Sequence, residues 1–294
     1  MLLTLLNIVL PVASVAALGF LFGRRQARPP DMAFINYANV MLFCPALVFA
    51  ALLDNPVNLV DSWPLVVAGA LIIVVPGLFL ALVPRPGLVR RAFLLSGMFR
   101  NTGNVGIPLM MLAYGRDQLG GIVVLFVLSN LLQFSLGLYL LSPKSSRWMW
   151  LRNPNIWAAV LGVALAPYRD SLPVFLLTVV EMLGHLAIPL MLFTLGVRIS
   201  QDRIQHLGLA LRINVVYLLA GALSVTLVVW LLPLTPEWTR LVVLSAMLPP
   251  AVLNYMLCEQ YRADPQIVAG VVLLGNVMAL ATIPVVVWLT LTWW

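Results

Sequence analysis

Charged residues are scarce in this chain. Of its 294 residues, 9% are Asp, Glu, Lys or Arg, whereas 62% are apolar, and the mean hydropathy is +1.03. Because a soluble domain carries about 25% charged residues, this composition excludes one and makes the lipid bilayer the solvent of the fold. Ten spans of about 20 residues would use roughly 200 residues. Too little chain remains for a soluble domain, so the function must lie within the membrane.

Cysteines and catalytic motifs are equally scarce. Cys44 and Cys258 lie in apolar stretches without the spacing of a disulfide framework or a metal site, and we expect small buried side chains there. The sequence has no HExxH, no GxSxG and no paired aspartates within the spans, which makes an intramembrane enzyme a weak alternative to a transporter. A channel is a third alternative, but a continuous ring of pore-lining charges is missing. We expect no metal and no cofactor.

Ten apolar segments alternate with short polar connections, and each is predicted to cross the membrane as a helix. The sixth is short. The first is followed by Arg24 and Arg25, whereas a signal peptide has its charges before the apolar run, so it is expected to be a mature helix. The predicted spans are residues 3–22, 34–53, 64–83, 92–113, 120–141, 155–167, 173–196, 207–232, 239–258 and 266–293.

The cations indicate an orientation rather than a nucleic-acid partner, because they are scattered through short loops. Alternate connections hold twelve of the 17 Lys and Arg residues, the intervening connections hold three, and Arg100 and Arg212 fall within spans. Cationic loops stay on the cytoplasmic side. Both chain ends are therefore expected outside, which is the periplasm if the chain lies in a bacterial inner membrane, as its compact loops indicate.

The second half of the chain repeats the first at an offset of about 145 residues. Each half has five spans, so the second enters the membrane from the opposite side, as in the inverted repeats of alternating-access transporters. The expected units are a first repeat at 1–142, a cytoplasmic linker at 143–153 and a second repeat at 154–294. The alternative is coincidence among apolar segments. The matching pairs include Pro11 with Pro154, Pro45 with Pro189, Phe49 with Phe193, Leu95–Met98 with Leu244–Met247, and Asn130 with Asn276.

Helix breakers interrupt the fourth and ninth spans. The fourth contains polar residues and glycines from Arg100 to Pro108, and the ninth contains Pro249 and Pro250. Unwound backbone at membrane depth is tolerated only beside protein or a watery cavity, so a central cavity is expected where the two spans cross. Helix N-termini facing that cavity would favour a carboxylate. The candidate ligand-contacting or break residues are Arg100, Asn101, Thr102, Gly103, Asn104, Gly106, Pro108, Pro249, Pro250 and Asn254.

Arg100 lies near mid-depth, where an unpaired charge costs about 2.5 to 3.5 kcal/mol. It is expected to contact a substrate carboxylate, to pair with Glu181, or to line a cavity wall that water reaches. Glu181 and His185 are four residues apart on one helical face, where they form either a proton relay or a structural pair. The intramembrane amides Asn130, Gln133 and Asn276 are candidates to line the crossover or to join helices.

Several motifs together resemble the auxin efflux carrier family, and the resemblance covers essentially the whole chain. They are Ile35-Asn36 followed by Pro45, Asn101-Thr102 with Gly106-Ile107-Pro108, Arg152-Asn153-Pro154-Asn155, Phe193-Thr194-Leu195-Gly196, and Leu248-Pro249 with Tyr261 and Asp264.

The resemblance implies an all-α fold of ten helices in two inverted repeats, with broken fourth and ninth helices that cross. It also implies a scaffold domain of helices 1, 2, 6 and 7, a transport domain of helices 3–5 and 8–10, and a homodimer formed through the scaffold. By the same resemblance the substrate carboxylate lies beside Asn101, in a pocket that Asn155 and Cys44 also line. The linker is much shorter than in the plant members, and Arg100 replaces an uncharged residue, which indicates a more strongly anionic substrate.

The expected function is a secondary transporter or uniporter that moves a small organic anion by alternating access. A monoanion that leaves a cytosol about 100 mV negative gains about 2.3 kcal/mol, so export needs no coupling ion. Import is the alternative, and it would require a coupling proton or sodium ion.

Overall fold

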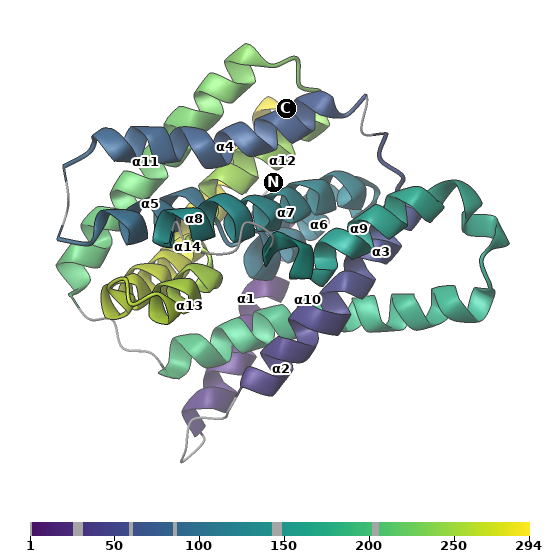
Figure 1. Ribbon diagram of the computed structural model, residues 1–294, viewed down its shortest axis with the longest axis horizontal. Helices are drawn as coiled ribbons and strands as arrows, with labels where there is room; N and C mark the ends of the chain where they lie inside the picture. The colour runs from purple at the N-terminus through teal and green to yellow at the C-terminus, as the bar shows by residue number, and fades with distance from the viewer. Residues whose placement is uncertain (1, 26–31, 59–60, 85–86, 143–148, 202–205) are drawn as a thin grey trace.

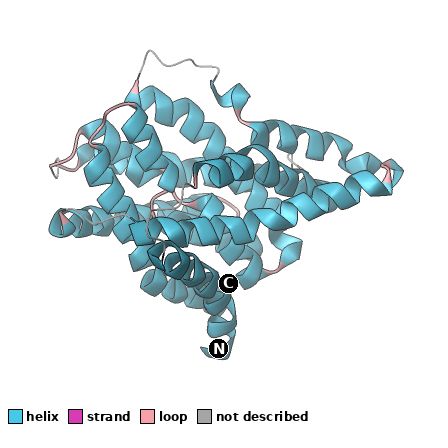
Figure 2. Ribbon diagram, turned by 90° about the horizontal axis from the view of Figure 1, so that it is seen from below, coloured by secondary structure: helices cyan, strands magenta, loops and turns pink. Residues whose placement is uncertain are grey.

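The structure, a computed structural model, describes residues 2–25, 32–58, 61–84, 87–142, 149–201 and 206–294. Within these ranges the chain is helical and has no strand, as Figure 2 shows. The α-helices are α1 (Leu2–Arg25), α2 (Ala33–Ala38), α3 (Cys44–Asp54), α4 (Trp63–Leu82), α5 (Arg90–Met98), α6 (Ile107–Tyr114), α7 (Leu119–Leu132), α8 (Leu138–Leu141), α9 (Pro154–Leu165), α10 (Val174–Gln201), α11 (Leu207–Leu231), α12 (Pro236–Met247), α13 (Val252–Gln260) and α14 (Pro265–Trp293). The π-helical segments are η1 (Asn39–Phe43), η2 (Thr102–Gly106) and η4 (Gln133–Gly137), and the 3-10 segments are η3 (Arg116–Gln118), η5 (Met149–Arg152) and η6 (Ala166–Ser171).

Six helical runs in the described part of the chain are long and apolar enough to cross a membrane. They coincide within a few residues with the predicted spans 2, 3, 5, 7, 8 and 10. The predicted fourth and ninth spans do not qualify because each is divided into short helices, and α9, in the predicted sixth span, has 12 residues. The chain is therefore a multi-pass helical membrane protein.

Helix starts depend on local chemistry. Pro64 occupies the first turn of α4, where its missing N–H removes no intrahelical bond. The side chain of Asn153 accepts a hydrogen bond from the Asn155 backbone N–H at 3.0 Å and caps α9. The Thr235 hydroxyl accepts one from the Trp238 N–H at 3.3 Å and caps α12. Apolar side chains dominate the remaining length of these helices, and the backbone stays helical there because only a helix satisfies its own backbone in lipid.

One group of helices is built on the pair α1 and α10. These two pack along each other, and α3 packs against α9 and α10; α3 and α9 lie in the right half of Figure 1, and α10 runs across its lower part. Glycines let the backbones of α1 and α10 touch, since a Cβ on Gly196 would lie 1.8 Å from the Ala16 carbonyl oxygen and one on Gly19 would lie 2.1 Å from that of Phe193. Small residues commonly allow such close packing of membrane helices.

A second group surrounds α4 and α11. α4 packs against α5, α7, α11 and α12, and α14 packs against α11, α12 and α13. The hydroxyl of the fully buried Tyr217 on α11 donates to the Phe93 carbonyl oxygen on α5 at 2.8 Å. The two groups meet where α10 contacts η2 and where α1 contacts α6 and α14. The interrupted fourth span therefore lies at the boundary between them.

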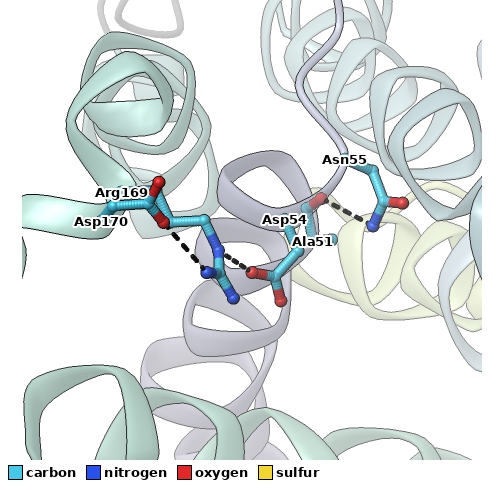
Figure 3. A network of polar contacts seen from close by, with 5 residues as sticks. All are labelled: Ala51, Asp54, Asn55, Arg169 and Asp170. Atoms are coloured by element: carbon cyan, nitrogen blue, oxygen red, sulfur yellow. Dashed lines mark hydrogen bonds and ion pairs between the residues drawn. The ribbon is translucent and has the colours of Figure 1, made fainter. Parts of the chain in front are cut away.

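An ion pair fixes one edge of the first group (Figure 3). The Nε of Arg169, in η6, lies 2.6 Å from the Asp54 Oδ1 at the end of α3. This hydrogen bond and the charge of Asp54 raise the pKa of Arg169 above its ordinary value. The pair is partly exposed, so it positions the connection after α9 more than it stabilises the fold.

Candidate functional site

The two helix interruptions lie against each other. α5 ends at Met98 and helix resumes at Thr102, while α12 ends at Met247 and helix resumes at Val252. The Asn101 N–H donates to the Pro249 carbonyl oxygen at 2.8 Å, and the Ala251 N–H donates to that of Phe99 at 3.0 Å. The two segments of unwound backbone thus pair as an isolated antiparallel bridge. This pairing satisfies backbone groups that lipid would leave unbonded.

The fourth span breaks at the start of its predicted polar run from Arg100 to Pro108. The sequence predicts Gly106 and Pro108 at the interruption, but the chain is helical from Thr102 to Tyr114 and both residues lie within helix. Pro108 is the second residue of α6 and directly follows the π-helical segment η2, so the helix changes its hydrogen-bonding pattern just before the proline instead of ending there. Gly106 instead serves packing, because a Cβ there would lie 2.8 Å from the Leu248 side chain. In the ninth span, by contrast, Pro249 and Pro250 do lie in the interruption.

Two pairs of amide side chains support the bridge. In the first, Gln133 donates to the Asn254 Oδ1 at 2.8 Å, and the Asn254 amide donates to the Phe99 carbonyl oxygen at 2.9 Å. In the second, Asn101 donates to the Asn276 Oδ1 at 2.9 Å, and the Asn276 amide donates to the Pro250 carbonyl oxygen at 3.2 Å. We call each of these two pairs an amide relay. Each relay satisfies a carbonyl group in one of the two breaks.

Arg100 occupies the centre of the bridge and is buried, with 5% of its surface exposed. Its Nη2 donates to the Tyr217 carbonyl oxygen at 2.7 Å, whereas its Nε is buried without an acceptor among the described residues. The two ion pairs found in the described ranges both involve Arg169. Arg100 therefore presents a buried positive charge to which no described carboxylate is paired, at a substantial desolvation cost.

Small cavities flank Arg100 on two sides. Thr102, Ser129 and Ser245 line one with it, and Asn214, Pro249 and Pro250 line the other. Each cavity has room for about one water molecule, so the crossover is closed in this conformation. The sequence analysis did not identify four of the residues around these cavities: Asn214, Tyr217, Ser129 and Ser245. Asn214 could have been identified, because it is a polar residue within an apolar run.

Other predicted site residues lie beside the crossover, or their side chains do not take part in the hydrogen bonds that join its two breaks. Thr102, Gly103 and Asn104 belong to the half-buried η2. Cys44 is buried in the core at the start of α3. The Asn155 side-chain amide donates to the Asn153 Oδ1, and the Asn153 amide in turn donates to the Asn130 Oδ1 at 3.4 Å. The buried Asn155 Oδ1 has no partner among the described residues.

Glu181 and His185 lie away from the site. Both are exposed on α10, whereas Arg100 is buried against α11. The ion pair between Arg100 and Glu181 is therefore not formed. The spacing of the two residues correctly predicts one helical face, but that face points outward because the buried face of α10 packs on α1 and α3.

Three of the carbonyl oxygens freed by the breaks already accept hydrogen bonds. The carbonyl groups of Phe99, Pro249 and Pro250 each receive an N–H from the bridge or from an amide relay. Across the described ranges, no three His, Cys, Asp or Glu side chains cluster as metal ligands would. What the crossover offers a ligand is the guanidinium of Arg100, surrounded by hydroxyl and amide groups, and this arrangement suits an anion.

A multi-pass helical chain with paired, unwound helices at its centre has the construction of a membrane transporter. The family described as "Membrane transport protein" matches residues 4–148 and 138–288. The chain therefore belongs to this family, the auxin efflux carrier family that its motifs resemble. Its family and relatives are transporters, not enzymes.

Two relatives extend the comparison. A Rhizobium meliloti (strain 1021) protein named "Putative malonate transporter" is 25% identical over 94% of this chain and 93% of its own length. An Oryza sativa subsp. japonica protein named "Probable auxin efflux carrier component 5b" is 28% identical over 48% of this chain and 40% of its own length. The bacterial relative thus matches almost end to end, and the plant relative matches over part of its length.

Proposed function

We propose that this protein carries a small organic anion across the membrane by alternating access, with the crossover as the carboxylate site. The observation that carries the proposal is Arg100, a buried cation held between the two breaks without a described carboxylate partner. A carboxylate substrate would supply the missing charge and accept from the guanidinium fork. The names of the two relatives, malonate transporter and auxin efflux carrier, support a carboxylate as the substrate class.

The proposed architecture is ten helices in two inverted repeats, 1–142 and 154–294, joined by the linker 143–153. Two family matches that meet near residues 138–148 support this division. The group built on α1, α3, α9 and α10 corresponds to the proposed scaffold, and the group around α4, α11 and α14 to the proposed transport domain. Movement of the second group against the first would expose the crossover to each side in turn. A homodimer through the scaffold, a bacterial inner membrane and periplasmic chain ends complete the proposal.

Export without a coupling ion is the proposed direction, because the membrane potential favours it. A monoanion leaving a cell at about 100 mV, negative inside, gains about 2.3 kcal/mol. The second candidate, an importer driven by protons or sodium, needs a coupling site. The carbonyl oxygens of the crossover are engaged by N–H donors, and Glu181 and His185 are exposed on α10.

Ligand-dependent thermal unfolding of the purified protein tests the proposal. Malonate, succinate, acetate and indole-3-acetate are added singly, and a true ligand at 100 times its Kd stabilises by about 2.7 kcal/mol. Arg100→Gln should lose this stabilisation, because the site then lacks its cation. Arg212→Gln is the matched control, since Arg212 is exposed on α11. Equal stabilisation of both variants would place the anion elsewhere.

A further inference from the structure

One face of α11 is exposed along nearly the whole helix, which runs along an outer edge of the molecule (Figure 1). The opposite face includes the buried Tyr217 and Val228 and packs against α4, α12 and α14. The exposed residues recur every three or four positions, so they lie on one side of the helix. Because the chain is a membrane protein, this side faces lipid, and we call it the lipid-facing stripe. Its members are Arg212, Val215, Leu219, Leu223, Leu227 and Trp230.

The two ends of the lipid-facing stripe are spaced like the two boundaries of a bilayer. Arg212 and Trp230 are 18 positions apart, which is five full helical turns and about 27 Å along the axis. The hydrocarbon core of a bilayer is about 30 Å thick, and the four stripe members between them are apolar. Trp is common at the membrane interface. Arg212 therefore lies at the level of the lipid headgroups, on the face to which the Arg-rich connection before α11 belongs.

Arg212 has no carboxylate partner within the described part of the protein, where both ion pairs involve Arg169. One turn before it, a Cβ on Gly208 would meet no atom within 4 Å, so the stripe is uncovered there too. An arginine at the edge of the hydrocarbon extends its guanidinium toward the headgroups. The planar guanidinium fork matches two oxygens of a phosphate group. A lipid phosphate is therefore the anion that this position offers to Arg212.

Apolar surface for the acyl chains lies beside Arg212. A Cβ on Gly87 would lie 3.7 Å from the Leu209 side chain, which places the connection after α4 against the first turn of α11. Near that end of α4, Leu78 and Leu82 are exposed. The headgroup phosphate and the acyl chains of one lipid can thus be bound side by side.

The net charge of the headgroup decides which lipid binds more tightly. A zwitterionic lipid has an ammonium group that offsets its phosphate, whereas phosphatidylglycerol has a net negative charge. One arginine near the surface of an anionic leaflet strengthens binding about fivefold. The favoured occupant is therefore an anionic phospholipid.

We propose that Arg212 binds the phosphate of an anionic phospholipid whose acyl chains lie along the exposed surface of α11 and α4. This site goes beyond the proposed function, because its ligand is a component of the bilayer and not the transported anion. It is also separate from the crossover. Arg212 lies on the exposed face of α11, whereas Arg100 donates to the Tyr217 carbonyl oxygen at the opposite, buried face.

Native mass spectrometry of the purified protein tests this inference. The protein in detergent is titrated separately with phosphatidylglycerol and with phosphatidylcholine of the same acyl chains. Wild type should bind one phosphatidylglycerol molecule about fivefold more tightly than phosphatidylcholine. Arg212→Gln should lose this one tightly bound molecule and bind phosphatidylcholine as wild type does. Arg212→Lys keeps the charge but not the fork, so its preference should be intermediate; this variant carries the test if Arg212→Gln does not fold.

Arg116→Gln is the matched control. Arg116 is also exposed, but it lies in η3, in a connection between helices and not on a lipid-facing stripe. The substitution removes the same charge, so it should leave the preference for phosphatidylglycerol unchanged. Inorganic phosphate, added at the concentration of the lipid, should not displace the bound lipid because it has no acyl chains.

Three results would overturn the inference: equal binding of the two lipids by wild type, an unchanged preference in Arg212→Gln, or an equal loss of preference in Arg116→Gln. Displacement of the lipid by inorganic phosphate would show a general anion site instead, and would overturn it as well. The proposed function is tested separately by the carboxylates. If none of them stabilises wild type, that function fails, whereas the lipid site is unaffected because it does not involve the crossover.

Discussion

Removing one member of an amide relay should lower the free energy of unfolding, because the other member is left without its hydrogen-bond partner in a buried site. In Asn254→Leu, the Gln133 amide loses its acceptor in a buried site, whereas the Phe99 carbonyl oxygen keeps the bond from the Ala251 N–H. One unsatisfied buried donor costs about 1 to 3 kcal/mol, and hydrogen bonds between membrane helices reach about 1.7 kcal/mol. We therefore expect a loss of about 1.5 kcal/mol, or about 3 °C in Tm.

A double-mutant cycle isolates this interaction. Gln133→Leu combined with Asn254→Leu removes donor and acceptor together, so the double variant should be about 1 kcal/mol more stable than the sum of the single changes predicts. Reversible unfolding in mixed detergent micelles provides the free energies. Gln133→Leu with Asn55→Leu is the control cycle, because Asn55 donates to the Ala51 carbonyl oxygen instead. If both cycles are additive within about 0.3 kcal/mol, the relay does not exist as described.

Packing, pH and charge each give one further prediction. Gly196→Ala should abolish stable folding because its Cβ would collide with the Ala16 backbone, whereas Gly208→Ala, with open space around it, should leave Tm within about 2 °C of wild type. Hydrogen bonds from the Glu237 backbone N–H and the Thr235 hydroxyl lower the pKa of Glu237 below its ordinary value of 4.5. The stability that this carboxylate contributes is therefore present above pH 4.5 and is lost as the pH falls through the lowered pKa. In thermal scans from about pH 6 to about pH 3, the Tm of wild type should fall by this contribution, whereas Glu237→Gln should not show this loss. Arg100→Met should unfold at the wild-type temperature or higher without substrate, since an unpaired buried charge is removed; a large drop in Tm would show that the charge is structurally required.

The spans were predictable from the sequence because lipid imposes one simple rule. Long apolar runs must be helices that satisfy their own backbone, and α4, α11 and α14 begin and end within two residues of the predicted boundaries. The position of the fourth break was not predictable in this way. Gly106 and Pro108 are compatible with helix as well as with a break, and the pairing with residues 249–251 decides the matter.

Residues of the site were predictable as polar groups in apolar surroundings, but their partners were not. Asn101 and Asn276 are 175 positions apart, and only the fold shows that they bond to each other. Arg100 donates to the backbone carbonyl oxygen of Tyr217 and does not pair with Glu181. The sequence could not predict this contact, because every residue has a backbone carbonyl group and nothing in the sequence distinguishes that of Tyr217. Apolar periodicity reports where a helix lies, whereas long-range contacts depend on how helices pack.

The most direct measurement is a structure of the protein bound to whichever carboxylate stabilises it most. The anion should lie within hydrogen-bond distance of the Arg100 guanidinium, between the two paired breaks, with a neighbouring cavity enlarged to admit it. An anion bound elsewhere, with Arg100 still enclosed as it is here, would contradict the claim that the crossover is the carboxylate site.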